Sequence, residues 1–326
     1  MLFQSTQKFD IIHDADFAKE MPVIEAELEK YVNRGYFPSF DGADLFYEFF
    51  KCAQPRASIV IVHGFTEFIK KYYELCWYFL NMGYNVFMFD LRGRGYSHRD
   101  IEDTEITHVD SFFDYVKDLE CFMNQIVTPN SDDAPAFIYS HSMGGAISAL
   151  YLAHCKNNVS KTILSSPMVY PVCTPLPHQV LRLLMRSEAK RFGWNAKFRF
   201  SSDFDPDFKL ENSMDLSKCR FQYNLDMRIR DMKYRNSSSS NRWNFEVLGV
   251  VDMLLDRKAM RNVSSETFII SAGKDTVVKN KPQLRLAKLL NSKYQCFENA
   301  KHSMFTMPDN DLAEYINTLL DFYACN

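Results

Sequence analysis

Residues 136–145 read Ala-Phe-Ile-Tyr-Ser-His-Ser-Met-Gly-Gly, a short apolar run that leads into small and polar residues. The run predicts a buried strand, and the stretch from Gly144 to His154 predicts a helix directly after it. Ser142 lies on the turn between them, which is where an α/β sheet presents a nucleophilic serine. The turn needs small residues two positions before and after the serine. Gly144 meets this need and Ser140 replaces the usual glycine, so we predict Ser142 as a nucleophile.

Strand and helix patterns alternate along most of the chain. Apolar runs predict strands at 58–62, 84–90, 136–139, 161–166, 267–272 and 294–297. Helical spacing of apolar residues predicts helices at 67–82, 109–127, 144–154, 281–290 and around 312–323. Two aromatic strands at 35–40 and 45–50, joined by an Asp-Gly turn, predict an opening hairpin. The alternation predicts an α/β fold, a mostly parallel sheet covered by helices on both faces.

An insertion interrupts this pattern between residues 166 and 267. We expect a core formed by 35–167 and 248–326, an inserted helical cap at 168–247, and an N-terminal lead-in segment at 1–34. One amphipathic helix is expected in the cap, because Val180, Leu181, Leu184 and Met185 would share one side of it.

The nucleophile needs a base, because a serine hydroxyl is weakly nucleophilic unless a neighbouring group accepts its proton. On such a sheet the acid and the base follow the serine along the chain, at the carboxyl ends of later strands. Asp275 and His302 follow the last two predicted strands. We predict His302 as the general base and Asp275 as the carboxylate that orients it. Asp252 and Asp256 precede those strands at a helical spacing, which indicates helix residues.

The turn after the first parallel strand reads His63-Gly64-Phe65. The negative charge of a tetrahedral intermediate is stabilised by preorganised backbone N–H groups. We expect the N–H groups of Phe65 and Met143 to form this oxyanion hole, with Gly64 allowing the loop to approach the nucleophile closely. His63, Gly64 and His141 are expected to lie next to the substrate.

Composition excludes several classes of function. The chain has 326 residues, of which 46% are hydrophobic and 24% charged, as in a soluble globular protein. Its net charge of −3 gives no indication of a nucleic-acid partner. The eight cysteines include no C-x-x-C pair, so we expect no metal site. The N-terminus lacks the pattern of a secretory signal, and no run is long enough for a membrane span. A cytoplasmic protein is therefore expected.

Taken together, these motifs resemble the lysophospholipase L2 and monoacylglycerol lipase branch of the α/β-hydrolases. The resemblance runs from about residue 35 to the C-terminus. It is carried by His63-Gly64-Phe65 with Glu67, Asp90-Leu91-Arg92-Gly93-Arg94-Gly95-Tyr96-Ser97, His141-Ser142-Met143-Gly144-Gly145, Gly273-Lys274-Asp275 and His302. In the cap, four serines at 237–240 replace the Gly-Gly-Pro-Thr of the family.

The resemblance implies an α/β-hydrolase fold and hydrolysis of a lipid-like carboxylic ester, a lysophospholipid or a monoacylglycerol. It also implies acylation of Ser142 followed by deacylation with water, with no metal or organic cofactor.

The cap itself is cationic. Between Leu181 and Trp243 there are 14 Lys and Arg against 8 Asp and Glu, a net charge of +6 that leaves −9 on the rest of the chain. Such a cap could contact an anionic membrane surface or a phosphate head group, which would make the protein peripheral to a membrane. The alternative is a solvated helical face with ordinary ion pairs.

Two rival functions stay open at this stage. An aminopeptidase or a small-ester esterase could use the same fold and triad, since a fold does not determine its substrate. An acidic pocket for a free amine would favour the peptidase, whereas an apolar acyl channel would favour a lipid. A non-catalytic binding protein is the third possibility, and it should have lost part of the triad, although all three positions are filled here.

Overall fold

The computed structural model describes residues 1–172 and 176–325, so residues 173–175 of the expected cap lie outside the described part. Its centre is an eight-stranded sheet in the order β1-β2-β4-β3-β6-β7-β9-β10. The strands are β1 (Asn33–Pro38), β2 (Asp44–Phe50), β3 (Ala57–Val62), β4 (Tyr84–Phe89), β6 (Ala136–His141), β7 (Val159–Ser165), β9 (Glu266–Ala272) and β10 (Lys293–Phe297). Strand β2 is antiparallel to β1 and β4, as the predicted hairpin requires, and all other pairs are parallel.

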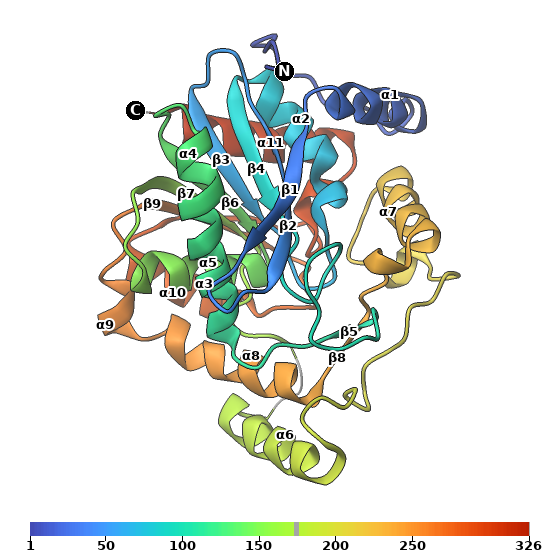
Figure 1. Cartoon of the computed structure of the whole chain (residues 1–326), viewed down its shortest axis with the longest axis vertical. Helices are drawn as coiled ribbons and strands as arrows, with labels where there is room; N and C mark the ends of the chain where they lie inside the picture. The colour runs from blue at the N-terminus through green and yellow to red at the C-terminus, as the bar shows by residue number, and fades with distance from the viewer. Residues whose placement is uncertain (173–175, 326) are drawn as a thin grey trace.

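Helices cover both faces of the sheet (Figure 1). One apolar core lies between the sheet and α1 (Phe17–Glu29), α2 (Tyr73–Asn81) and α11 (Asp309–Ala324). A second core lies on the opposite face, beneath α3 (Phe112–Phe122), α5 (Met143–His154), α8 (Asn241–Leu254), α9 (Arg257–Met260) and α10 (Asn280–Leu290). The predicted mostly parallel sheet with helices on both faces is confirmed.

Some elements differ from the sequence prediction. The expected helix at 67–82 begins as a 3-10 turn (Ile69–Tyr72) before α2, and the one at 109–127 ends in a π-helical turn (Met123–Val127) followed by α4 (Thr128–Asn130). Helix α1 lies within the lead-in segment, where no helix was expected. It contains Pro22, which normally interrupts a helix, and its stability comes from burying Phe17, Met21, Ile24 and Leu28.

The cap segment contains two long helices, α6 (His178–Phe192) and α7 (Lys218–Arg230), with 3-10 turns at Leu210–Asn212 and Met232–Tyr234. A two-residue strand, β8 (Ser238–Ser239), pairs with β5 (Ile106–Thr107) of the core. The expected cap boundary at 247/248 falls inside α8, which packs against α3 and α5. The predicted helix near residue 180 is present as α6, but only Leu181 of its expected apolar side is buried, because α6 packs on α8 at the outside of the molecule (Figure 1).

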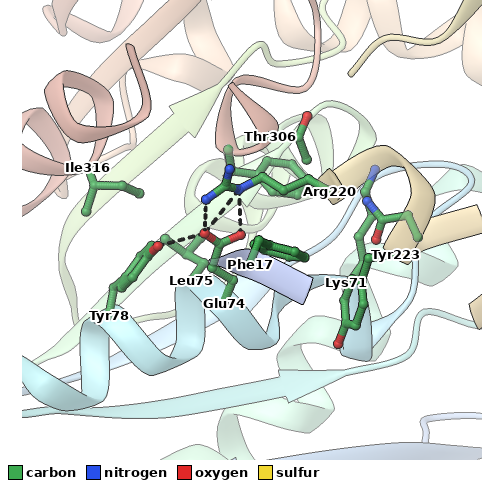
Figure 2. A pocket seen from close by; sticks show the side chains of 11 residues that line it. Phe17, Lys71, Glu74, Leu75, Tyr78, Arg220, Tyr223, Thr306 and Ile316 are labelled. Carbon is green, nitrogen blue, oxygen red and sulfur yellow. Dashed lines mark hydrogen bonds and ion pairs between the residues drawn. The ribbon is translucent and has the colours of Figure 1, made fainter. Parts of the chain in front are cut away.

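The helix α7 is fastened to the core by a buried arginine. Arg220 donates to the Oε2 and Oε1 of Glu74 on α2 at 2.9 Å and 2.6 Å, and to the carbonyl of Ile12 at 2.7 Å. Asp14 of the lead-in segment also contacts it. Figure 2 shows the guanidinium lying over Glu74, with Phe17 beside it. The lead-in segment and α2 therefore hold one half of the cap against the sheet.

Candidate active site

Ser142 lies at the sharp turn between β6 and α5, with φ 53° and ψ −116°. This backbone conformation is unusual for a residue with a side chain. It persists only where the surrounding structure enforces it. The Ser142 N–H donates to the carbonyl of Ser165, and the Ser142 carbonyl accepts from Gly145. A Cβ at Gly144 would lie 2.1 Å from the carbonyl oxygen of Val62, so only glycine allows the turn to pack against β3.

Ser140 occupies the position where the family pattern has a glycine. It is fully buried, and its hydroxyl donates to the carbonyl of Ile163 on the neighbouring strand at 3.2 Å. The extra polar group therefore has a partner inside the sheet. The departure from the pattern fits the turn.

The structure brings the three predicted triad residues together. The Nε2 of His302 lies 2.8 Å from the Oγ of Ser142, and its Nδ1 lies 2.7 Å from the Oδ2 of Asp275. The second carboxylate oxygen of Asp275 accepts from the backbone N–H groups of Val277 and Val278 at 2.8 Å and 3.0 Å. Asp275 follows β9 and His302 follows β10, so adjacent parallel strands deliver the two side chains to one edge of the sheet.

Burial and neighbouring charges determine the protonation of His302 and Asp275. Burial lowers the pKa of His302 below its usual value, assisted by the charge of His141 and opposed by the hydrogen bond to Asp275. Burial alone would raise the pKa of Asp275, but the hydrogen bond and charge of His302, with the two backbone N–H groups, lower it overall. At neutral pH the arrangement therefore has an ionised carboxylate next to a neutral imidazole, which can accept a proton from Ser142.

The loop after β3 lies against the nucleophile turn. A Cβ at Gly64 would lie 2.6 Å from the Oε2 of Glu67, so the glycine allows the close approach expected of this loop. Among the described residues, the N–H groups of Phe65 and Met143 have no hydrogen-bond acceptor. Both are donors that an oxyanion could use. The ring of Phe65 packs on Trp243 of α8, with the ring centroids 4.1 Å apart.

The two histidines expected beside the substrate contact the protein framework. The Nδ1 of His63 lies 2.9 Å from the carbonyl of Gly64, and its Nε2 accepts from the N–H of Leu91 at 3.0 Å. Burial lowers the pKa of His63 to about 4, so this ring is neutral. The Nε2 of His141 lies 3.1 Å from the carbonyl of His302. Contact of either ring with a substrate stays a prediction.

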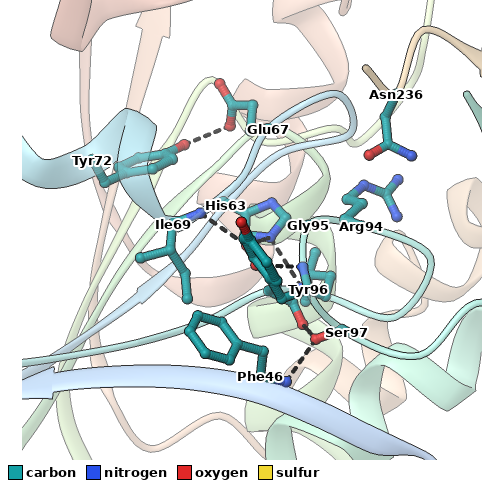
Figure 3. A network of polar contacts seen from close by, with 12 residues as sticks. Phe46, His63, Glu67, Ile69, Tyr72, Arg94, Gly95, Tyr96, Ser97 and Asn236 are labelled. Atoms are coloured by element: carbon teal, nitrogen blue, oxygen red, sulfur yellow. Dashed lines mark hydrogen bonds and ion pairs between the residues drawn. The ribbon is translucent and has the colours of Figure 1, made fainter. Parts of the chain in front are cut away.

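Glu67 is a buried residue whose role sequence reasoning missed. Its Oε2 accepts from the N–H of Gly64 and the hydroxyl of Tyr72, both at 2.5 Å, and lies 3.0 Å from the Nδ1 of His141. Its Oε1 accepts from Lys71 at 2.9 Å. Figure 3 shows Glu67 facing Tyr72 above His63. Burial alone would raise the pKa of Glu67, but the charges of His141 and Lys71 hold it well below its usual value.

The rival carboxylates have other partners. Asp252 on α8 lies 2.8 Å from the Nε2 of His178 on α6, and Asp256 caps α9 by accepting from the N–H of Lys258. Neither contacts His302. Two features of the sequence could have indicated the cluster around Glu67: its place in the motif with His63-Gly64-Phe65, and its i, i+4 spacing to Lys71.

The cap segment closes over the site. Ser142 is 6% exposed and His302 is 5% exposed. Tyr96, in the loop after β4, donates to Asp231 of the cap at 2.6 Å, and Asn236 donates to the carbonyl of Gly93 at 2.9 Å. Because Ser142 is nearly covered, a large substrate can reach it only if residues around it move.

The described part of the chain shows no metal site and no membrane-spanning helix. There, no group of three or more His, Cys, Asp or Glu side chains is placed to hold a metal ion. None of the helices in 1–172 and 176–325 is long and apolar enough to cross a membrane. The seven described cysteines are free thiols.

Known proteins resemble this chain in sequence. The model of the family described as serine aminopeptidase, S33, matches residues 53–309. The chain is 27% identical over 261 residues to a probable lysophospholipase L2 of Haemophilus influenzae, covering 78% of this chain and 80% of the relative. It is 39% identical over 110 residues to lysophospholipase L2 of Escherichia coli, a match that spans 34% of this chain and 32% of the relative.

Solved structures show the same fold. A soluble variant of monoglyceride lipase from Saccharomyces cerevisiae, in complex with a substrate analog, aligns with a TM-score of 0.72 at 21% identity, covering 90% of this chain and 95% of that one. A highly thermostable carboxyl esterase from Bacillus coagulans aligns with the same TM-score of 0.72, at 17% identity. The alignment covers 90% of this chain and 99% of the esterase. The expected α/β-hydrolase fold is confirmed.

Proposed function

This chain belongs to the serine aminopeptidase S33 family of α/β-hydrolases, and from that premise we propose that it is a serine carboxylic-ester hydrolase acting on lysophospholipids or monoacylglycerols. The observation that carries the proposal is the position of His302, 2.8 Å from the Oγ of Ser142 and 2.7 Å from Asp275. A neutral, buried imidazole between a hydroxyl and a carboxylate is suited to activating the hydroxyl.

In the proposed reaction, His302 accepts the proton of Ser142 as its Oγ attacks the ester carbonyl. The oxyanion of the tetrahedral intermediate accepts hydrogen bonds from the N–H groups of Phe65 and Met143. The intermediate collapses to an acyl-enzyme while the protonated His302 gives its proton to the leaving alcohol. Water, deprotonated by the same imidazole, then releases the fatty acid and restores Ser142.

Charge favours a lipid ester over a peptide with a free amine. The stretch of the cap from Leu181 to Trp243 carries a net charge of +6, which repels a protonated amine and attracts a phosphate. Arg228 on α7 donates to the carbonyls of Tyr234 and Asn236 and, among the described residues, forms no ion pair with a carboxylate. Burial lowers its pKa to about 10, yet it stays charged at neutral pH. The names of the similar proteins, lysophospholipase L2 and monoglyceride lipase, favour the same substrates.

Labelling by a fluorophosphonate probe tests the nucleophile. Wild-type protein should be labelled, and Ser142→Ala should not be labelled. The thermal stability of Ser142→Ala should equal that of the wild type. Ser140→Gly is the matched control: it changes a serine of the same turn and should leave labelling intact. Labelling that persists in Ser142→Ala would assign the chemistry to another serine.

A substrate panel tests the class of ester. We expect hydrolysis of 1-acyl lysophospholipids or monoacylglycerols to exceed that of acetyl esters and aminoacyl amides. Each buried methylene contributes about 0.8 kcal/mol, so kcat/KM should rise by up to about 15-fold per added pair of carbons until the acyl site is full. Preference for acetyl esters would support a small-ester esterase, and preference for aminoacyl amides would support the aminopeptidase.

We further propose that α6 contacts an anionic lipid surface. Four apolar side chains of this helix face solvent: Val180, Leu183, Leu184 and Phe192 are 41%, 66%, 50% and 50% exposed. The exposed cations on the same helix are Arg186, Lys190 and Arg191. Apolar side chains flanked by cations are suited to the interface of an anionic bilayer. Figure 1 shows α6 standing away from the sheet, where such a surface could reach it.

Sedimentation with vesicles tests this contact. Wild-type protein should bind phosphatidylglycerol vesicles more strongly than phosphatidylcholine vesicles, and Leu183→Ser/Leu184→Ser should reduce binding while hydrolysis of a short soluble ester is unchanged. Val23→Ser, which alters a similarly exposed side chain on α1, serves as the control. Equal binding by the double variant and the wild type would refute the contact.

A further inference from the structure

Arg94 is a fully buried arginine in the loop after β4. Its Nε donates to the carbonyl oxygen of Phe65, and its Nη2 lies 3.7 Å from the Sδ of Met143. Its Nη1 donates to the carbonyl of Arg92 and to the hydroxyl of Tyr115, both at 3.2 Å. Figure 3 places Arg94 between His63 and Asn236 of the cap. One guanidinium thus contacts both residues whose N–H groups are proposed to bind the oxyanion.

The charge of Arg94 has no carboxylate within ion-pair distance among the described residues. Its hydrogen-bond acceptors are carbonyls, a hydroxyl and a sulfur, and the guanidinium lies over the rings of Phe65 and Tyr115, 5.2 Å and 5.7 Å from their centroids. The buried carboxylate of the same loop, Asp90, accepts instead from the N–H groups of Ile69 and Tyr96. Two residues before Arg94, Arg92 is different: it is paired with Asp118 at 2.7 Å and with Asp41 at 2.8 Å.

An unpaired buried cation is costly, because desolvation of the charge is not offset by an opposite charge. The cost is offset when negative charge appears nearby, and in ester hydrolysis negative charge appears on the oxyanion. A positive charge that is already in place needs no reorganisation during the reaction. The position of Arg94 behind Phe65 and Met143 fits this requirement.

We propose that Arg94 is a positioning residue of the ester hydrolase: it fixes the backbone of Phe65 against Met143 and supplies a positive charge behind the oxyanion hole. The inference rests on the proposed function of Ser142. The hydrogen bond to the Phe65 carbonyl limits rotation of the same residue whose N–H is the oxyanion donor. Arg92, by contrast, braces the loop from a site that contacts neither donor residue.

The test compares Arg94→Met and Arg94→Lys with the matched control Arg92→Lys. We expect Arg94→Met to lower kcat for a p-nitrophenyl ester by roughly 10- to 100-fold with KM changed less than about threefold, since loss of one direct oxyanion donor costs about 10²–10³. Arg94→Lys keeps the positive charge, and its kcat should lie between those of Arg94→Met and the wild type. Arg92→Lys should lower the melting temperature while kcat stays within about threefold.

Inhibitor binding separates this role from a purely structural one. An alkylboronic acid forms an anionic tetrahedral adduct with a nucleophilic serine, whereas an ether analogue of the ester stays neutral. In Arg94→Met the affinity for the boronic acid should fall in parallel with kcat, and the affinity for the ether should be unchanged. Equal losses for both inhibitors, or unchanged kcat in either folded Arg94 variant, would overturn the proposal. Failure of Ser142 labelling in the wild type would instead overturn the proposed function.

Discussion

The Nε2 of His141 lies 3.1 Å from the backbone carbonyl oxygen of His302, so the residue before the proposed nucleophile supports the loop of the proposed base. The other nitrogen of the same ring lies 3.0 Å from Glu67, which also accepts from the N–H of Gly64. One buried pair, Glu67 and His141, therefore connects the oxyanion loop, the nucleophile turn and the loop of His302.

Replacement of His141 by alanine should release this support. We expect kcat/KM to fall by roughly 10- to 100-fold, because a displacement of about 1 Å in a catalytic group can cost 10² in rate. His178→Ala is the control: it removes a histidine of the cap helix α6 that pairs with Asp252 of α8. This variant should leave hydrolysis of short soluble esters nearly unchanged. Steady-state kinetics on such an ester measures both variants. Equal activity of His141→Ala and wild type would show that the pair does not position His302.

Asp275→Asn should lower kcat by about 10⁴, because the amide cannot hold the imidazole in the tautomer that accepts the proton of Ser142. Asp252→Asn is the corresponding change at the carboxylate that pairs with His178, and kcat on a short ester should be unaffected. Both are measured by initial rates after confirmation of folding. If Asp252→Asn rather than Asp275→Asn abolished turnover, the orienting carboxylate would be misassigned.

The pH dependence of kcat/KM should reflect the lowered pKa of His302. The base acts in its neutral form, so activity is retained above the pKa of the folded state and lost as the pH falls through it. Since burial lowers this pKa, the acid limb should lie below about 6.5, the ordinary value for histidine. Rates on a p-nitrophenyl ester, recorded at the isosbestic wavelength of p-nitrophenol, test this. An acid limb above that value would contradict the assignment of a buried, neutral base.

The central strands of the sheet were predictable because they are buried on both faces and read as continuous apolar runs. The runs at 58–62 and 267–272, for example, match β3 and β9 to within one residue. Helix α1 was missed because Pro22 interrupts its pattern, and α7 because its residues are mostly polar. Packing of α1 on α2 and of α7 on α1, which no local pattern records, stabilises these helices.

The positions of Ser142, Asp275 and His302 relative to the strands follow from the sequence, whereas the supporting residues do not. Arg94 and Arg92 are indistinguishable in the sequence, and only the tertiary structure separates an arginine beside Phe65 from one paired with Asp118. The roles of the triad and oxyanion residues stay predictions until they are tested.

The pairing of Arg220 with Glu74 gives the last prediction, which concerns how the cap is held. The Arg220 side chain is 1% exposed, and burial raises the pKa of Glu74 in spite of the neighbouring guanidinium. Removal of one partner of such a pair costs about 3–5 kcal/mol, because the remaining charge is buried without compensation. Arg220→Met should therefore lower the urea midpoint strongly at neutral pH.

The sign of the pH dependence follows from Glu74. Without Arg220 the carboxylate of Glu74 would have a folded-state pKa further above its value in the unfolded chain. The loss of stability in Arg220→Met should therefore be smallest at acidic pH and grow as the pH rises through the folded-state pKa of Glu74. The double variant Arg220→Met/Glu74→Gln should recover most of the loss, since no buried charge remains in that pair. Arg199→Met removes the half-exposed cap pair with Glu188 and should cost less than about 1 kcal/mol. A loss in Arg220→Met that is independent of pH and unrelieved by Glu74→Gln would mean that α7 is held by apolar packing instead, because packing contacts do not titrate.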